Sequence, residues 1–128
     1  MGGVAGCRDD TGAAFDAGGQ QAVAVVSAVG SLQRLSLRFA GQNDPVALEG
    51  PFEITALSGT IDPRHQHLHV TVADGAGRCL GGHLPPSGAE VFTTVELVLL
   101  ALPDLAFSRQ PCAASGYPEL SIRRITGP

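Results

Sequence analysis

The sequence predicts one small sheet-rich domain, either α+β or mainly β, with seven or eight strands and at most one or two helices. Three observations lead to this class. Apolar and polar residues alternate over several short segments, glycine- and proline-containing turns separate those segments, and the one helical candidate is a short stretch around residues 13–17. The chain has 128 residues, enough for one domain with one core.

The elements follow one another along the chain with clear boundaries. Residues 1–20 are glycine-rich and weakly patterned, so we expect a weakly ordered N-terminal segment, followed by a single domain over residues 21–128. The most apolar stretch, residues 91–102, predicts a long central strand. The predicted strands cover residues 22–29, 32–39, 46–48, 53–57, 66–73, 78–84, 91–102 and 120–122.

The charge pattern argues against a nucleic-acid-binding surface. The formal net charge is −4, from 12 acidic and 8 basic residues, and all the basic residues are scattered arginines apart from the adjacent Arg123 and Arg124. A duplex-binding protein needs clustered cations to displace counterions from phosphates. We therefore expect little or no direct DNA binding.

The cysteines and the start of the chain predict a cytoplasmic protein. Cys7, Cys79 and Cys112 are odd in number and outside any CxxC pair, which is typical of reduced thiols in the cytosol. The first 14 residues lack the apolar stretch of a signal peptide, and no apolar run is long enough to cross a bilayer.

The histidines form the main candidate site. All four lie between positions 65 and 83, and His67 and His69 are two residues apart in a predicted strand, so their side chains share one face of the sheet. His83 lies on the next predicted strand, which we expect to pair with the strand of His67 and His69. Imidazoles at this spacing bind one divalent ion without backbone distortion, and we identify His67, His69 and His83 as a metal site.

The register of this hairpin decides whether the three histidines meet. A two-residue loop at Gly75-Ala76 would turn His83 away from His69. A three-residue loop ending at Gly77 pairs His69 with His83 and Gly81 with Thr71, and such loops favour glycine at their left-handed position. The metal site requires this second register.

Several other residues have both structural and functional interpretations. Glu53 and Glu96 lie in otherwise apolar strands, where each either forms an ion pair or faces a site. Arg109 is the candidate anion clamp if a substrate exists, against a surface or ion-pair role. His65 is interpreted as a solvated loop residue, and Cys79 shares the alternation of His83 and is a candidate soft ligand.

The chain also resembles a known family, the PPC (plants and prokaryotes conserved) domain, in its stand-alone prokaryotic form. The resemblance spans about residues 20–125, and its most specific part is the pair of motifs His67-Leu68-His69 and Gly81-Gly82-His83. In plants this domain accompanies AT-hooks, DNA-binding segments with an Arg-Gly-Arg-Pro-like core, which this chain lacks. The opening 20 residues depart from the family pattern.

The resemblance implies an α+β fold with a central, mostly antiparallel sheet of about seven strands and one or two short helices. It also implies a homotrimer and a metal, which we take to be zinc, on His67, His69 and His83. The expected function is a regulatory or scaffold module, of a kind named DNA-binding by analogy with the plant proteins.

The alternative is a metal-dependent enzyme, because three histidines leave a coordination position for water or a small-molecule ligand. Its general base would be Glu53 or Glu96. A cupin is disfavoured, since its glutamate four or five residues after the HxH motif is replaced by Asp74 and Gly75.

Overall fold

The computed structural model describes residues 4–6 and 19–125, and every regular element in these ranges is a β-strand. The strands are β1 (Val4–Gly6), β2 (Val23–Leu37), β3 (Val46–Ile61), β4 (Gln66–Ala73), β5 (Cys79–Leu84), β6 (Ala89–Ala101), β7 (Leu105–Pro111) and β8 (Pro118–Arg124). Within the described ranges, there is no helix of the length and apolar character that a membrane crossing requires.

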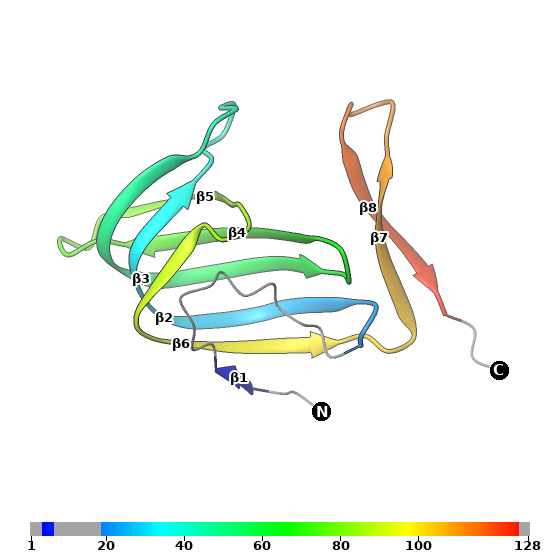
Figure 1. Ribbon diagram of the computed structural model, residues 1–128, viewed down its shortest axis with the longest axis horizontal. Helices are drawn as coiled ribbons and strands as arrows, with labels where there is room; N and C mark the ends of the chain where they lie inside the picture. The colour runs from blue at the N-terminus through cyan, green and yellow to red at the C-terminus, as the bar shows by residue number, and fades with distance from the viewer. Residues whose placement is uncertain (1–3, 7–18, 126–128) are drawn as a thin grey trace.

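Six strands form one antiparallel sheet in the order β1-β6-β2-β3-β4-β5. The long strands β2 and β3 bend strongly (Figure 1), and the register of β2 shifts between Leu32 and Arg34 against both of its neighbours. Bulges of this kind increase the bend and twist of a strand. The sheet therefore curls until Arg38, just beyond the end of β2, bridges to His83 on the opposite edge strand β5.

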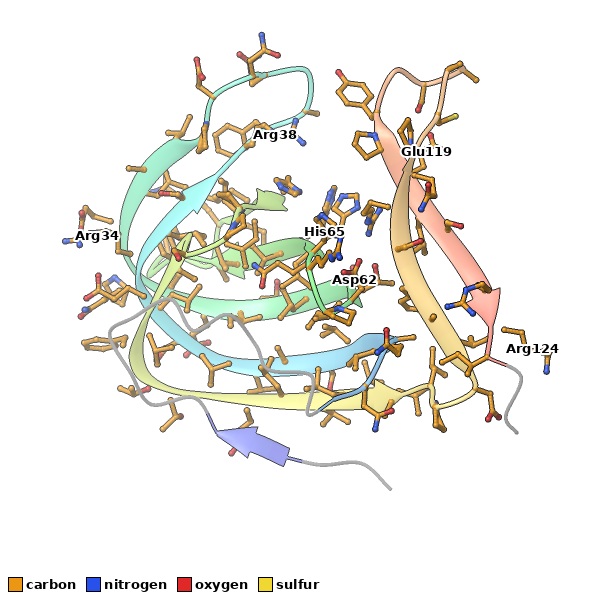
Figure 2. The ribbon with its side chains drawn as sticks, turned by 45° about the vertical axis from the view of Figure 1, so that its right-hand side comes forward. Arg34, Arg38, Asp62, His65, Glu119 and Arg124 are labelled. Carbon is orange, nitrogen blue, oxygen red and sulfur yellow. The ribbon has the colours of Figure 1, made fainter. Side chains whose placement is uncertain are left out.

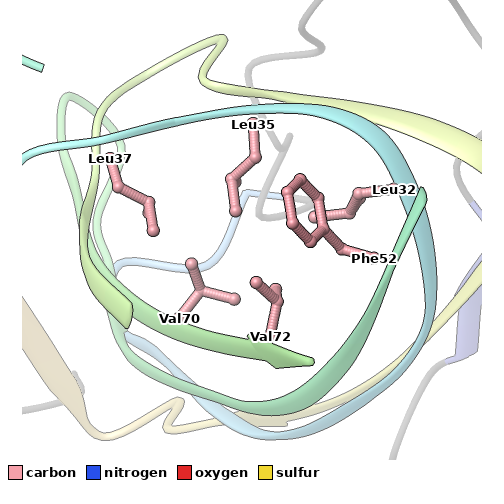
Figure 3. Close-up of a cluster of buried hydrophobic side chains, with 6 residues drawn as sticks. All are labelled: Leu32, Leu35, Leu37, Phe52, Val70 and Val72. Carbon is pink, nitrogen blue, oxygen red and sulfur yellow. The ribbon is translucent and has the colours of Figure 1, made fainter. Parts of the chain in front are cut away.

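The core fills the inside of this curl. Figure 3 shows six buried side chains enclosed by the curved strands: Leu32, Leu35, Leu37, Phe52, Val70 and Val72. On β4, Leu68, Val70 and Val72 are buried, whereas the alternate residues His67 and His69 are exposed. The period-2 pattern thus places the histidines on the outer face, as the sequence predicts.

The last two strands form a separate antiparallel hairpin that stands beside the curved sheet (Figure 1). At its base, the Phe107 side chain is buried, and the Phe107 amide donates to the Gln21 carbonyl at 3.0 Å. The Leu102 amide donates to the Ala22 carbonyl at 3.0 Å. The hairpin is therefore attached to the start of β2.

The predicted α+β class is wrong for the described residues, which are all-β. Alternating and β-branched residues continue through almost all of this part of the chain, and this pattern favours strands over the short helices that we expected. The predicted helix around residues 13–17 lies outside the described residues. Most of the segment 1–20 does too, so its predicted weak order stays a prediction.

The strands are also longer than the sequence predicts. The predicted strands 22–29 and 32–39 are joined in β2, and the strands predicted at 46–48 and 53–57 are joined in β3. Strands β1 and β7 were not predicted.

Candidate metal centre

The hairpin of β4 and β5 has the register that a metal site requires. His69 pairs with His83, and Thr71 pairs with Gly81. The loop has three residues, because the Asp74 amide donates to the Arg78 carbonyl at 2.9 Å. Its last residue, Gly77, has a φ of 78°, the left-handed conformation that glycine adopts without steric cost. The predicted register is confirmed.

The Asp74 side chain fixes the conformation of this turn. One carboxylate oxygen accepts hydrogen bonds from the amides of Ala76 and Arg78, each at 2.9 Å, and the other accepts from Arg78 Nε at 3.0 Å. The Arg78 and Ala76 amides, which stabilise the charged form, hold the pKa of Asp74 below its usual value. These hydrogen bonds to the Asp74 carboxylate fix the turn and so hold β4 and β5 in register.

The three imidazoles form a triangle on the outer face of the sheet. Their ring centroids are 5.3 Å apart for His67 and His69, 5.3 Å for His67 and His83, and 5.6 Å for His69 and His83. One nitrogen from each ring lies within 4.8 Å of the others. A tetrahedral zinc spaces its nitrogen ligands about 3.4 Å apart, so small side-chain rotations bring the three rings around one ion.

One ring nitrogen of this group lacks a hydrogen-bond partner. His83 Nδ1 is buried and has no hydrogen-bond partner among the described residues. A buried polar atom left unsatisfied costs about 1–3 kcal/mol. If this nitrogen bound a metal ion, or accepted a hydrogen bond from or donated one to a water beside a bound ion, the cost would be removed.

The protonation state of the cluster suits metal binding as well. Partial loss of solvation lowers the pKa of His67, although the residue lies on the outer face, and the nearby charges of Arg109, His69 and Arg38 lower it further. The pKa of His83 is lowered by burial and then by Arg38, His67 and His69. Both rings are therefore neutral at pH 7, and the neutral imidazole is the form that binds metals.

Two arginines from distant parts of the chain flank the histidines. Arg38 pairs directly with His83 through two backbone hydrogen bonds of 3.0 and 3.1 Å, so its side chain lies on the histidine face. Arg109, on β7, donates from Nη2 to the Thr60 hydroxyl at 3.1 Å, and Thr60 is the cross-strand partner of His67. Sequence reasoning singled out Arg109 but missed Arg38, because only the curl of the sheet brings it to the site.

The remaining sequence candidates lie elsewhere. His65 is in the β3–β4 loop, as predicted, and its Nδ1 is 3.3 Å from an oxygen of the buried Asp62 (Figure 2). Cys79 is an exposed free thiol that does not join the histidine group. Glu53 and Glu96 are exposed and, within residues 4–6 and 19–125, no carboxylate lies with the three imidazoles.

A shallow groove adjoins the histidines where the β7–β8 hairpin meets the sheet. Its volume is about 260 Å³, and its lining residues are Ser58, Gly59, Thr60, His67, His69, Arg109 and Leu120. The groove gives a small molecule access to the face on which the imidazoles converge.

Relatives by sequence are found within longer proteins. The chain is 50% identical over 107 residues to the "Bifunctional protein GlmU" of one Synechococcus strain, and 49% identical over 105 residues to that of another. These matches include 84% and 82% of this chain. The chain spans 17% of the length of either relative.

Several solved structures share this fold over most of the chain. A hypothetical protein from Salmonella enterica is 40% identical, with a TM-score of 0.85 over 97% of this chain and 95% of its own. A metal-containing protein from Archaeoglobus fulgidus is 26% identical, with a TM-score of 0.72 over 93% of this chain and 91% of its own. A third structure, from Bacteroides thetaiotaomicron, has a provisional DNA-binding description; it is 25% identical, with a TM-score of 0.69 over 81% of this chain and 75% of its own.

The family model of the Plants and Prokaryotes Conserved (PCC) domain matches residues 13–103, which include all of β2 to β6 and the three histidines. This is the family, also written PPC, that the sequence motifs resemble. The match covers well over half of the chain, and the chain belongs to the Plants and Prokaryotes Conserved domain family.

Proposed function

We propose that this chain is a metal-binding module of regulatory or scaffold character, in which His67, His69 and His83 hold one divalent ion, zinc. The observation that carries the proposal is the convergence of three imidazoles from two strands, one of which, His83, has a buried Nδ1 with no hydrogen-bond partner among the described residues. The name of the metal-containing Archaeoglobus relative supports it. The free thiols of Cys79 and Cys112 suit a cytoplasmic setting.

The histidines account for three of the four positions of a tetrahedral zinc. Zinc, when bound, would supply Lewis-acid character at the remaining position. The chain's own contribution is to hold the imidazoles in register, through the Asp74 turn and the Arg38 bridge to His83.

Zinc titration of the metal-free protein tests this proposal. After chelation and dialysis, calorimetry should report one zinc per chain. His69→Ala should lose more than the roughly ten- to hundredfold in affinity that outer-shell partners are worth, with an unchanged circular dichroism spectrum. His65→Gln is the matched control, because His65 is the fourth histidine and lies outside the group; it should bind zinc like the wild type. Equal affinity in His69→Ala and His65→Gln would refute the site.

A homotrimer is the second part of the proposal. Large apolar side chains are exposed on two neighbouring strands: Val26 and Val29 on β2, and Phe92, Val98 and Leu100 on β6, each between 46% and 65% exposed. Apolar surface of this kind is typical of a face covered by another subunit. Light scattering should report three times 13.1 kDa, and Val98→Glu should lower that mass. A monomer at micromolar concentration would contradict the proposal.

We also propose that the isolated domain binds duplex DNA weakly or not at all. Its arginines are partly neutralised: Arg34 pairs with Glu49 and Glu90, and Arg78 pairs with Asp74. Fluorescence anisotropy with a labelled duplex at physiological salt should show no saturable binding. Submicromolar binding with a steep salt dependence would contradict this part.

A metal-dependent enzyme is the alternative, and the groove beside the histidines favours it. Its weakness is the general base, because Glu53 pairs across the sheet with Ser31 and with Ala73, at the far end of β4 from His67 and His69. Glu96 lies opposite Val29 and Gly6. Neither carboxylate is part of the histidine group, so the module is the better-supported function.

A further inference from the structure

Arg109 and Arg38 contact neutral groups, whereas Arg34 and Arg78 contact carboxylates. Arg34 and Arg78 each pair with a carboxylate. Among the described residues, neither Arg109 nor Arg38 forms a salt bridge; Arg109 donates to the Thr60 hydroxyl, and Arg38 donates from Nη1 to the Gln42 carbonyl at 3.3 Å. A hydroxyl and a carbonyl leave the charge of the guanidinium uncompensated.

The hairpin aims Arg109 into the groove. Phe107, two residues earlier on β7, is buried at the base of the hairpin, and alternation puts Arg109 on the same face. Leu120 is its cross-strand partner on β8 and also lines the groove. The outer wall of the groove thus carries one cation beside one apolar side chain.

The charge of the groove selects the sign of a ligand. Its lining includes His67, His69 and Arg109 and no carboxylate, and Arg38 is the bridge partner of His83, the third histidine of the group. In Figure 2, Arg38 lies at the end of the sheet nearest the hairpin, whereas Arg34 lies on the opposite side of the molecule. A divalent ion on the histidines would add further positive charge, so the groove favours an anion.

We propose that this groove binds a small organic carboxylate, with one carboxylate oxygen at the open position of the metal and the other accepting hydrogen bonds from Arg109. The planar guanidinium matches a carboxylate in geometry. Leu120 contacts the apolar part of the ligand. A groove of about 260 Å³ lies just under the roughly 300 Å³ at which drug-sized sites begin, so it suits a ligand smaller than drug size. This inference rests on the proposed metal site.

The test uses the cobalt(II)-loaded full chain, whose visible absorption spectrum reports changes in metal coordination. Butyrate, acetate and inorganic phosphate are titrated separately. Butyrate should shift the spectrum saturably and bind more tightly than phosphate. Arg109→Gln should bind cobalt as the wild type does but weaken butyrate roughly ten- to hundredfold, as expected for loss of a hydrogen bond to a charged group. Arg123→Gln is the matched control, because Arg123 lies on the opposite face of the same hairpin, paired with Ala106.

Each outcome decides the inference. Cobalt binding with no spectral response to carboxylates, or equal butyrate affinity in Arg109→Gln and Arg123→Gln, overturns the inference and leaves the metal site standing. Tighter binding of phosphate overturns the carboxylate class. Failure to bind cobalt at all overturns the proposed function and this inference together. Leu120→Ala provides a second test if Arg109→Gln does not fold: it should weaken butyrate several-fold and leave acetate unchanged, and equal effects on both would count against the groove.

Discussion

Replacing Gly59 with alanine tests how closely β3 approaches the histidine strand. Gly59 pairs with Leu68, between the two histidines of β4, and has a φ of 143°. A Cβ at this position would collide with the His67 carbonyl oxygen and lie 3.0 Å from the Leu68 Cα. Alanine therefore strains its own backbone and pushes β4 away from β3.

The two effects set the expected magnitude. A glycine-only backbone conformation forced on another residue costs about 1–3 kcal/mol, and overpacking of a well-packed site costs about 1–3 kcal/mol more. We expect the free energy of unfolding to fall by about 2–6 kcal/mol, out of a typical 5–15 kcal/mol. Zinc affinity should fall as well, because the displaced residue is His67.

Urea denaturation in the presence of a chelator measures this change without a contribution from metal. Gly75→Ala is the control: its Cβ would have no atom within 4 Å and its φ is not positive, so its effect should stay within about 0.5 kcal/mol. A loss of less than about 1 kcal/mol for Gly59→Ala, or equal losses for both variants, would refute the contact between β3 and β4 as described.

Three further predictions concern the turn and the core. Gly77→Ala should lower the free energy of unfolding by about 1–2 kcal/mol. The cost is backbone strain alone, because the φ of Gly77 is 78° and a Cβ there would meet no atom within 4 Å. Urea denaturation measures the loss, and a smaller loss for Gly77→Asn would separate backbone strain from a clash. Asp74→Asn should be less stable than the wild type at pH 7. The folded state lowers the pKa of Asp74, so the carboxylate stabilises the fold above its unfolded-state pKa. This stabilisation is lost as the pH falls through the folded-state pKa, and the difference in stability between the two proteins should therefore vanish in acid. A difference independent of pH would contradict the carboxylate's role. Leu35→Ala, at a fully buried core position, should cost about 2–5 kcal/mol, and a loss near zero in the same assay would contradict the enclosed core.

The histidine centre could be predicted because every step of the argument is local. Strand alternation puts His67 and His69 on one face, and the glycine at position 77 selects the three-residue loop that brings His83 opposite His69. Each rule concerns residues within about one hairpin of each other. The confirmed register follows from local backbone geometry alone.

The surroundings of the site could not be predicted, because they depend on long-range closure. Arg38 reaches His83 only after bulges bend β2 around the core, and nothing in the alternating pattern of this segment marks where the bends occur. Strand β7 was missed because Ala106 and Phe107 are both buried, one on each face, which removes the alternation that reveals a strand. Arg109 could therefore be named as a candidate but not placed.

The helix expectation fails for a related reason. The residue pattern is compatible with either an α+β or a mainly-β domain, and the family resemblance favoured the former. In residues 19–125, strand propensity fills most of the chain, and the connections are turns and bends, such as the three-residue loop after Asp74.

Anomalous diffraction at the zinc edge, from crystals grown with one equivalent of zinc, tests the metal centre most directly. We predict a single strong peak per chain, about 2.0–2.2 Å from one nitrogen each of His67, His69 and His83. The Arg109 guanidinium should lie on the open side of the ion. A peak elsewhere, or no peak between these three imidazoles at full zinc loading, would contradict the account.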